Sequence, residues 1–282
     1  MAIIPKIEYE TKLQERLSAP MVWKEVCLVK YTDTGIWRNP YLTDATVGTG
    51  TRGTGYTPYA VATTDDTVSI TDYVYSAPVI DDADLAQKTF SDWMEVADNV
   101  GTMLNEKMET AMLAEHAQWT NFDNASIGGS AGNITPAITN IKKIITGIKR
   151  EIREAGGGDM LARNGGFVLW READFELVET LASSEGFSTA DDALQNGIKQ
   201  GFKYMGMEHY SSSKHASGHV FAGVKKAFAV GICKSTYGKV KTIVNPVVSG
   251  AQISGIGLES RIDSKFKAWT KMVPVLFDVL VA

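Results

Sequence analysis

Serine, lysine and histidine side chains occur at several places where their spacing resembles catalytic or metal-binding motifs. Residues 128–132, Gly-Gly-Ser-Ala-Gly, match the G-x-S-x-G pattern that presents a serine nucleophile, here Ser130. That chemistry requires a sharp turn between an apolar strand and a helix. Residues 121–126 are mostly polar, and residues 133–136 separate the motif from the next helical pattern. The context favours a glycine-rich loop, and a serine hydrolase using Ser130 is a distant alternative.

Three of the four histidines, His209, His215 and His219, fall in one short stretch of the chain. Imidazole is a common zinc ligand, so the grouping raises the question of a metal site. The intervening residues 210–218 are serine-rich and loop-like, and no fourth ligand lies nearby in the sequence. We therefore expect surface histidines and no metal site.

Two further patterns lack the partners that their chemistry needs. Residues 211–214 match S-x-x-K, but neither S-D-N nor K-T-G follows. Residues 231–235 end in the Lys-Ser of a phosphate-binding loop, but Ile232 and Cys233 separate the glycine from the lysine. The sequence therefore predicts no catalytic residue, no cofactor-binding residue and no metal ligand, and it predicts that the protein is not an enzyme.

The composition is typical of a folded globular chain. The 282 residues are 44% hydrophobic and 22% charged, which allows one elaborate domain or two ordinary ones. No stretch approaches the roughly 20 apolar residues that cross a bilayer, and residues 1–10 lack the pattern of a signal peptide. We expect a product that stays in a cytoplasm. The net charge of -5 predicts that any contact with nucleic acid is weak and non-specific.

The elements that position these residues begin with two strand-like segments. Val26, Leu28 and Lys30 alternate along one segment, and residues 67–75 are dense in β-branched and aromatic residues. These segments could be the two arms of one long hairpin. Residues 46–58 lie between them and are rich in glycine and threonine, with almost nothing apolar to bury. Contacts from outside the subunit must therefore order this segment, because burial does not offset its backbone entropy. A plain flexible surface loop is the alternative.

A long amphipathic helix is predicted next, after an acidic start at residues 81–84. An uninterrupted helix over residues 83–119 would be roughly 55 Å long, and Gly101 is a candidate break or bend. We interpret its methionine-rich stripe as core rather than as a binding surface. The apolar positions recur at spacings of three and four: Trp93, Val96, Ala97, Val100, Met103, Leu104, Met108, Ala111 and Met112.

A second helix is predicted from Thr135 as N-cap and Pro136 at the first position, ending at residues 156–158. Its apolar face comprises Ile138, Ile141, Ile145, Ile148 and Ile152. Residues 166–170 are predicted to form a buried strand and residues 172–183 a third helix. Within residues 256–268 the apolar residues fall on even positions (Ile256, Leu258, Ile262, Phe266 and Ala268) and the charged residues on odd ones (Glu259, Arg261, Asp263, Lys265 and Lys267). This alternation predicts a strand with one buried face, and the apolar run at residues 273–281 predicts a final strand.

The order of these elements resembles that of tailed-bacteriophage major capsid proteins, whose fold is named after bacteriophage Hong Kong 97. The shared order is a β-rich start, an extended hairpin with a Gly/Thr tip, a long helix, an α/β middle and a long charged strand. The resemblance implies an α+β fold. Its parts would be an N-arm at 1–21, an extended β-hairpin loop at 22–80, a peripheral domain with the spine helix at 81–132, an axial domain at 133–244 and a return to the peripheral domain at 245–282.

The resemblance also implies a function. The chain would assemble through hexamers and pentamers into the icosahedral shell that encloses the genome of a virion, built in the host cytoplasm. It would bind no cofactor. Its partners would be further copies of itself, a separate scaffolding protein, a portal and decoration proteins, with non-specific proximity to packaged DNA and no membrane. Arg52, Tyr56 and Tyr59 of the extended loop would contact the neighbouring subunit. An encapsulin-like compartment shell has the same fold and is the alternative.

Two features depart from some members of that family. Residues 23–31 have the pattern of a strand where some members carry a helical scaffolding segment, so we expect a scaffold that is separate or removed. No lysine occurs from residue 31 to residue 87, whereas some members cross-link subunits through a lysine on the extended loop. We therefore expect a shell held by non-covalent contacts.

Overall fold

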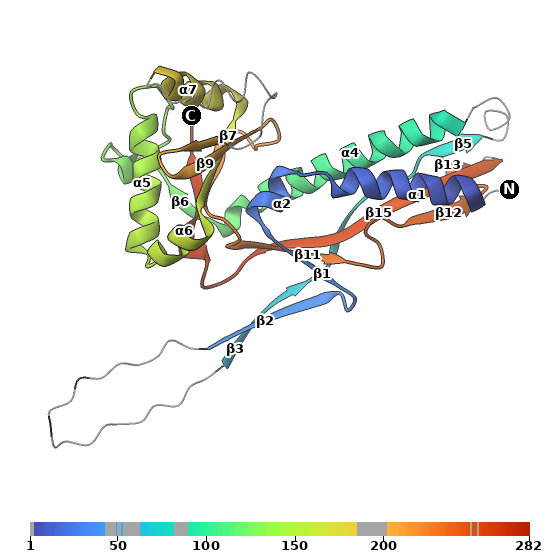
Figure 1. The fold of residues 1–282 in the computed structure, drawn as a ribbon, viewed down its shortest axis with the longest axis horizontal. Helices are drawn as coiled ribbons and strands as arrows, with labels where there is room; N and C mark the ends of the chain where they lie inside the picture. The colour runs from blue at the N-terminus through green and yellow to red at the C-terminus, as the bar shows by residue number, and fades with distance from the viewer. Residues whose placement is uncertain are drawn as a thin grey trace.

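The computed structural model describes residues 3–42, 49, 52, 63–81, 90–184, 202–248, 250–252 and 254–282. Within these residues, two six-stranded sheets carry most of the strands, and helices pack on each of them (Figure 1). Two smaller pairs of strands form separate sheets: β2 (Ile36–Leu42) with β3 (Thr63–Ser69), and β13 (Val247–Val248) with β14 (Ala251–Gln252). In this described part of the chain, no helix is long and apolar enough to span a membrane.

The first sheet is built around the long strand β15, Gly255–Ala268. Its even positions from Leu258 to Ala268 are buried and its odd positions are partly exposed, as the alternation predicted. The other strands of this sheet are β1 (Leu28–Thr32), β4 (Asp72–Ser76), β5 (Val79–Asp81), β11 (Phe228–Cys233) and β12 (Val240–Val244), in the order β1-β11-β15-β12 with β4 and β5 also paired to β15.

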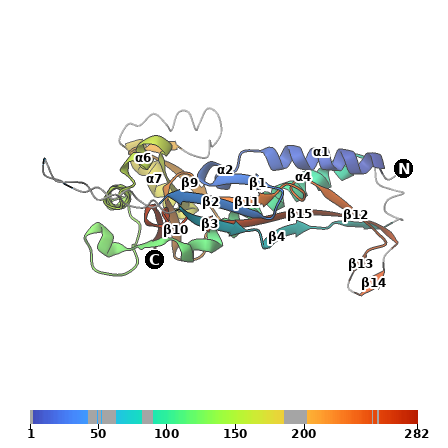
Figure 2. The ribbon, with the colours of Figure 1, turned by 90° about the horizontal axis from the view of Figure 1, so that it is seen from below.

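Helices α1 (Ile3–Ser18) and α4 (Phe90–Ala114) lie side by side on one face of this sheet (Figure 2). Helix α4 has 25 residues and is therefore about 37 Å long. It runs through Gly101 without interruption, so the expected break there is wrong. A Cβ atom at Gly101 would lie 2.8 Å from Cβ of Arg16, which shows that this glycine allows close approach of the two helices.

The methionine-rich stripe of α4 is largely core, as predicted. Met108 and Met112 are fully buried, and the Ser264 hydroxyl of β15 lies 3.3 Å from Sδ of Met108. Met103 is the exception, with 58% of its surface exposed. Helix α1, for which the sequence predicted only an arm, contributes Tyr9, Leu13 and Leu17 to the same core, because their spacing of four places them on one helix face.

The second sheet has the order β6-β16-β10-β7-β9-β8. Its strands are β6 (Thr120–Phe122), β7 (Gly166–Arg171), β8 (Phe202–Tyr204), β9 (Met207–Ser212), β10 (His219–Val224) and β16 (Leu276–Leu280). Helices α5 (Ile141–Glu154), α6 (Gly158–Asn164) and α7 (Glu172–Ser184) pack on it. The buried strand β7 and helix α7 confirm two sequence predictions.

Helix α5 begins later than the predicted start at Thr135 and Pro136. The Asn140 side chain accepts a hydrogen bond from the backbone N–H of Ala137 (2.8 Å) and donates one to the carbonyl of Thr135 (2.9 Å). This turn satisfies backbone groups that a helix would otherwise use, so the helix starts at Ile141.

Of the apolar positions predicted for this helix, all except the first, Ile138, are buried. Ile138 lies before the helix and is 46% exposed, whereas Ile141, Ile144, Ile145, Ile148 and Ile152 are fully buried. Gly156, with φ +79°, ends the helix as predicted.

The predicted strand over residues 23–31 is partly wrong. Val22–Val26 form a short helix, α2, in which Val22, Trp23 and Val26 are buried together. Strand β1 follows, and it pairs in parallel with β11 rather than with residues 67–75. The hairpin instead joins β2 (Ile36–Leu42) to β3 (Thr63–Ser69), and a break at Ile70 and Thr71 separates β3 from β4.

Sheet membership does not follow the expected division at residues 244 and 245. Strands β15 and β16 both lie after this division, but they belong to different sheets. Strands β10 and β11 both lie before it and are also in different sheets. The assignment of peripheral and axial domains stays a prediction.

Candidate functional site: the β2–β3 hairpin

The β2–β3 hairpin extends away from both large sheets (Figure 1). Its strands pair antiparallel from Ile36 opposite Ser69 to Leu42 opposite Thr63. An isolated two-stranded ribbon is marginally stable in water. The hairpin therefore needs contacts at its base to hold a fixed direction.

An apolar contact holds one side of the base. Val68 is buried against Trp269 and Ala229, and the ring of Trp37 meets the ring of Trp269 edge to face at 4.7 Å and 86°. Gly35, with φ +67°, makes the preceding turn and accepts a 2.8 Å hydrogen bond from the backbone N–H of Ile70. The apolar contact joins the hairpin to the segment that follows β15.

A buried carboxylate holds the hairpin to the same segment. Asp66 is 5% exposed; its Oδ1 accepts a hydrogen bond from Lys267, and its Oδ2 accepts one of 2.7 Å from the backbone N–H of Thr270. Lys267 also donates to the carbonyl of Thr67 at 2.8 Å. Burial alone would raise the pKa of Asp66, but these bonds outweigh it and hold the pKa below its usual value. We call Trp37, Asp66, Val68, Lys267, Trp269 and Thr270 the hairpin anchor.

The residues predicted to contact a neighbouring subunit lie in the segment between β2 and β3. Arg52 is exposed on a turn. Tyr56 and Tyr59 lie outside the described residues, as does most of the 46–58 segment. Their role stays a prediction.

Ser130 lies in the loop that the sequence favoured over a nucleophile elbow. The loop follows the 3-10 helix η2 (Asn124–Ile127), and Ser130 is exposed on it. Its backbone carbonyl accepts a 3.1 Å hydrogen bond from the Asn124 side chain, which closes the loop on itself. This arrangement is not the strand-to-helix turn that the hydrolase chemistry requires.

The three clustered histidines do not meet in space as one site. His209 is fully buried, so the expectation of a surface residue is wrong; it lies on the inward face of β9. Its Nδ1 accepts a 2.9 Å hydrogen bond from the indole of Trp170, and its Nε2 therefore donates to the carbonyl of Tyr204 at 3.1 Å. Burial lowers the pKa of His209 to about 4, and it lowers the pKa of His215 to about 4 as well. Both rings are neutral at pH 7.

His219 instead meets His116, the one histidine that lies outside the stretch. The two rings stack with centroids 3.9 Å apart, and both face the carboxylate of Asp278. Burial raises the pKa of Asp278, although hydrogen bonds from the two histidines oppose this effect. Sequence reasoning missed the group because its members are far apart in the chain. A lone acidic residue in the apolar run 273–281 was the available signal.

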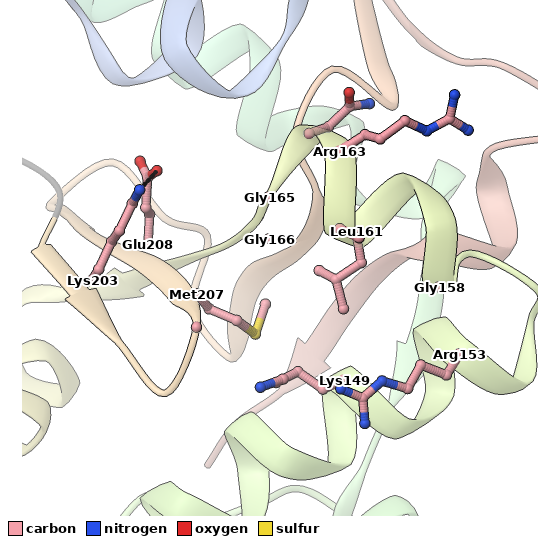
Figure 3. A pocket seen from close by; sticks show the side chains of 13 residues that line it. Lys149, Arg153, Gly158, Leu161, Arg163, Gly165, Gly166, Lys203, Met207 and Glu208 are labelled. Atoms are coloured by element: carbon pink, nitrogen blue, oxygen red, sulfur yellow. Dashed lines mark ion pairs between the residues drawn. The ribbon is translucent and has the colours of Figure 1, made fainter.

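A pocket of about 540 Å³ opens between α5, α6 and the turn from β8 to β9. Lys149 and Arg153 lie on one side of it and Lys203 and Glu208 on another (Figure 3). Arg163 also contributes to the lining. Glu208 is already paired with Lys225 and with Lys203 at 3.8 Å, so the pocket carries excess positive charge. Sequence reasoning missed it because its cations come from three separate elements, α5, α6 and β8.

Comparison with known proteins identifies structures that share this architecture. No protein-family model matches the chain, and no curated protein matches it in sequence. Solved structures match over most of its length. The asymmetric unit of the bacteriophage PhiM1 mature capsid is 13% identical, with a TM-score of 0.59 over 94% of this chain and 88% of that one. The capsid of Cyanophage P-SCSP1u is 14% identical, with a TM-score of 0.54 over 93% and 88%.

A third match is the virus-like particle from Pyrococcus furiosus, which is 7% identical, with a TM-score of 0.57 over 97% of this chain and 98% of that one. Identities this low establish the fold alone. The chain has the α+β Hong Kong 97-like capsid fold, as predicted. The matched structures named here are capsids and a virus-like particle, and no enzyme family is indicated.

Proposed function

We propose that the protein is the major capsid protein of a tailed bacteriophage, which assembles through hexamers and pentamers into the icosahedral shell around the genome. The projecting hairpin carries this proposal. Among the residues that the structure describes, its two strands pair with each other alone, yet its base is fixed by the hairpin anchor. A two-stranded ribbon anchored at its base suits contact with a neighbouring subunit.

The shell would be held by many repeated non-covalent contacts. No lysine occurs in residues 31–87, so the hairpin offers no amine for a cross-link. Each interface can then be weak, because closure of a symmetric shell multiplies the contacts. A separate scaffolding protein, a portal and decoration proteins are the expected partners in a virion assembled in the host cytoplasm.

A compartment shell that encloses protein cargo is the second candidate. The match to the virus-like particle from Pyrococcus furiosus, which covers nearly all of both chains, keeps it open, because this particle has the same fold and its name does not call it a phage capsid. The two functions differ in what the particle contains. Particles should be purified from cells that carry the complete genome from which this protein comes. They should contain DNA if the proposal is right, whereas a protein cargo without DNA would support the compartment shell instead.

The hairpin assignment is tested by replacing residues 46–58 with Asn-Gly, a dipeptide that closes short hairpins well. We expect the shortened protein to fold, because the replaced segment contains almost nothing apolar to bury. We also expect it to fail to close shells. Circular dichroism measures folding and electron microscopy measures assembly, with and without a co-expressed scaffold. Normal shells from the shortened protein would refute the assignment.

A second pair of variants separates side-chain contacts from loop length. Arg52→Ala, Tyr56→Ala and Tyr59→Ala together should reduce assembly. The matched control replaces Thr46, Thr49 and Thr51 with Ala in the same segment and should assemble normally. Equal behaviour of the two triple variants would remove these three residues from the proposed interface. Light scattering that shows only monomers of the unaltered protein under all salt and scaffold conditions would contradict the shell function itself.

A further inference from the structure

Three potential metal ligands from three different elements meet at the end of α4. His116 lies in the 3-10 helix η1 (Glu115–Gln118), His219 begins β10, and Asp278 lies in the middle of β16. The oxygen Oδ2 of Asp278 is 2.7 Å from Nδ1 of His219 and 3.6 Å from Nδ1 of His116. One ligand atom from each residue lies within 4.8 Å of the other two.

The carboxylate of this group is buried with one of its two oxygens unsatisfied. Asp278 is 2% exposed, and its second oxygen, Oδ1, is buried without a hydrogen-bond partner. Among the residues that the structure describes, its ion-pair partners are the two histidines and no lysine or arginine. A buried anionic carboxylate is costly unless a cation accompanies it.

The two imidazole rings are stacked at 3.9 Å with an interplanar angle of 29°, and the Nδ1 atoms of both lie near the same oxygen, Oδ2 of Asp278. Two neutral imidazoles and one carboxylate can bind a divalent cation together, and such an ion would neutralise the buried carboxylate.

We propose that His116, His219 and Asp278 bind one divalent transition-metal ion of the zinc class. Zinc bound at 2.0–2.2 Å from each ligand atom would separate the ligand atoms by roughly 3.4 Å. The distances from Oδ2 of Asp278 to the two Nδ1 atoms, 2.7 and 3.6 Å, lie on either side of that value, and all three ligand atoms lie within 4.8 Å of one another, so side-chain rotations would complete the site.

Two imidazoles and one carboxylate suit zinc and neighbouring transition metals, whereas calcium and magnesium take oxygen ligands. The histidine side chains are 30% and 27% exposed, which leaves the remaining coordination position open to water. The ion would connect the end of α4, which packs on the first sheet, to β10 and β16 of the second sheet. Its role would therefore be to brace the junction of the two sheets.

Cobalt binding tests the site, because Co²⁺ replaces Zn²⁺ and has visible absorption bands that report its ligands. Full-length protein without a histidine tag is treated with EDTA, dialysed and titrated with Co²⁺, and then with Zn²⁺ as competitor. We expect one Co²⁺ per chain, displacement by Zn²⁺, and a rise in Tm that grows with Zn²⁺ concentration. His116→Gln and Asp278→Asn should each weaken binding at least about tenfold.

The matched control is His215→Gln, which removes a histidine outside the group and should keep cobalt affinity and stoichiometry. Three results would overturn the proposal: no cobalt absorption from protein that circular dichroism shows to be folded, equal affinity in His116→Gln and the unaltered chain, or an equal loss in His215→Gln. If Asp278→Asn fails to fold, His116→Gln decides the question, since His116 lies outside the sheet and is partly exposed.

Discussion

The hairpin anchor can be tested by changing a single atom of Asp66. The two carboxylate oxygens accept from different donors: Oδ1 from Lys267 and Oδ2 from the backbone N–H of Thr270. Asp66→Asn keeps the size and shape of the side chain but leaves one acceptor oxygen in place of two. Whichever way the amide turns, one of the two donors faces an NH₂ group.

The expected loss of stability at the hairpin base follows from the hydrogen bond that Asp66→Asn removes. Removing one partner of a charge-assisted hydrogen bond costs about 1.5–3 kcal/mol. The Lys267 side chain is 33% exposed, and solvent screens part of its interaction, so we place the loss at about 2 kcal/mol. The base of the hairpin would then open roughly 30-fold more often, as a local event rather than as unfolding of the whole chain.

Hydrogen–deuterium exchange of peptides covering residues 63–70 and 266–272 measures this opening. Asp65→Asn is the matched control, because it makes the same charge change at an exposed neighbour. We expect faster exchange in both peptides for Asp66→Asn. For Asp65→Asn we expect the free energy of opening to change by less than about 0.5 kcal/mol. The reasoning fails if the two variants exchange at the same rate.

The dependence on pH provides an internal check on the same variant. The folded-state pKa of Asp66 is depressed, so its carboxylate contributes stability that is fully present above the unfolded-state value of about 4. That contribution is lost as the pH falls through the lower folded-state pKa. The difference in exchange rate between the unaltered chain and Asp66→Asn should therefore disappear at acid pH. A difference that persists there would contradict the electrostatic explanation.

Two further predictions concern the core. Burial lowers the pKa of His209 to about 4, so as the pH falls the unfolded chain takes up this proton near pH 6.5, before the folded chain does. The free energy of unfolding should therefore be fully present above pH 6.5 and fall by about 3 kcal/mol for this residue as the pH approaches 4. Urea unfolding at pH 7 and pH 4.5 measures this loss of unfolding free energy. His209→Gln should remove about half of the pH dependence, since His215 titrates in the same pH range. Gly101→Ala should destabilise the protein by about 1–3 kcal/mol, because the added Cβ would lie 2.8 Å from Arg16, despite the better helix propensity of alanine. A rise in Tm for Gly101→Ala would show that α1 and α4 are not packed closely at this point.

The elements that could be predicted from the sequence are those with a long local pattern. Strand β15 alternates from Leu258 to Ala268, and the apolar positions of α5 recur over about four turns, so neither pattern depends on what lies elsewhere in the chain. The segment at 22–31 is too short for such a pattern. Trp23 and Val26 pack as a helix against the core, and only the following residues extend as a strand.

Strand pairing and the site contacts depend on residues far apart in the chain. Strand β1 pairs with β11 some two hundred residues later, which no local pattern records. The hairpin anchor joins Asp66 to Lys267, and the proposed metal site joins His116 to Asp278. Neither contact lies within one sheet: Asp66 and Lys267 are in different sheets, and His116 is in the 3-10 helix η1. The one local sign was Asp278, a charged residue inside an otherwise apolar run.

The junction between the two sheets is where these features come together. The chain crosses from β15 to β16 through residues 269–275, and this crossing contains Trp269 and Thr270 of the hairpin anchor. It crosses again from α4 to β6 through η1, where Trp119 stacks on Phe221 of β10 at 3.5 Å and meets Phe228 of β11 edge to face.

The base of the hairpin is thus bonded to one of the connections that hold the two sheets together, and His116 lies on the other. On the other connection, Glu115 of η1 pairs at 2.9 Å with Lys265 of β15, the strand that also carries Lys267 of the hairpin anchor. The hairpin joins the body of the subunit through its backbone, which continues into β1 and β4 of the first sheet, and through the anchor, which binds it to residues 267–270 beside the sheet junction. Contact with a neighbour through the hairpin would therefore act on the first sheet and on the junction together, and a bound metal ion would stiffen the junction.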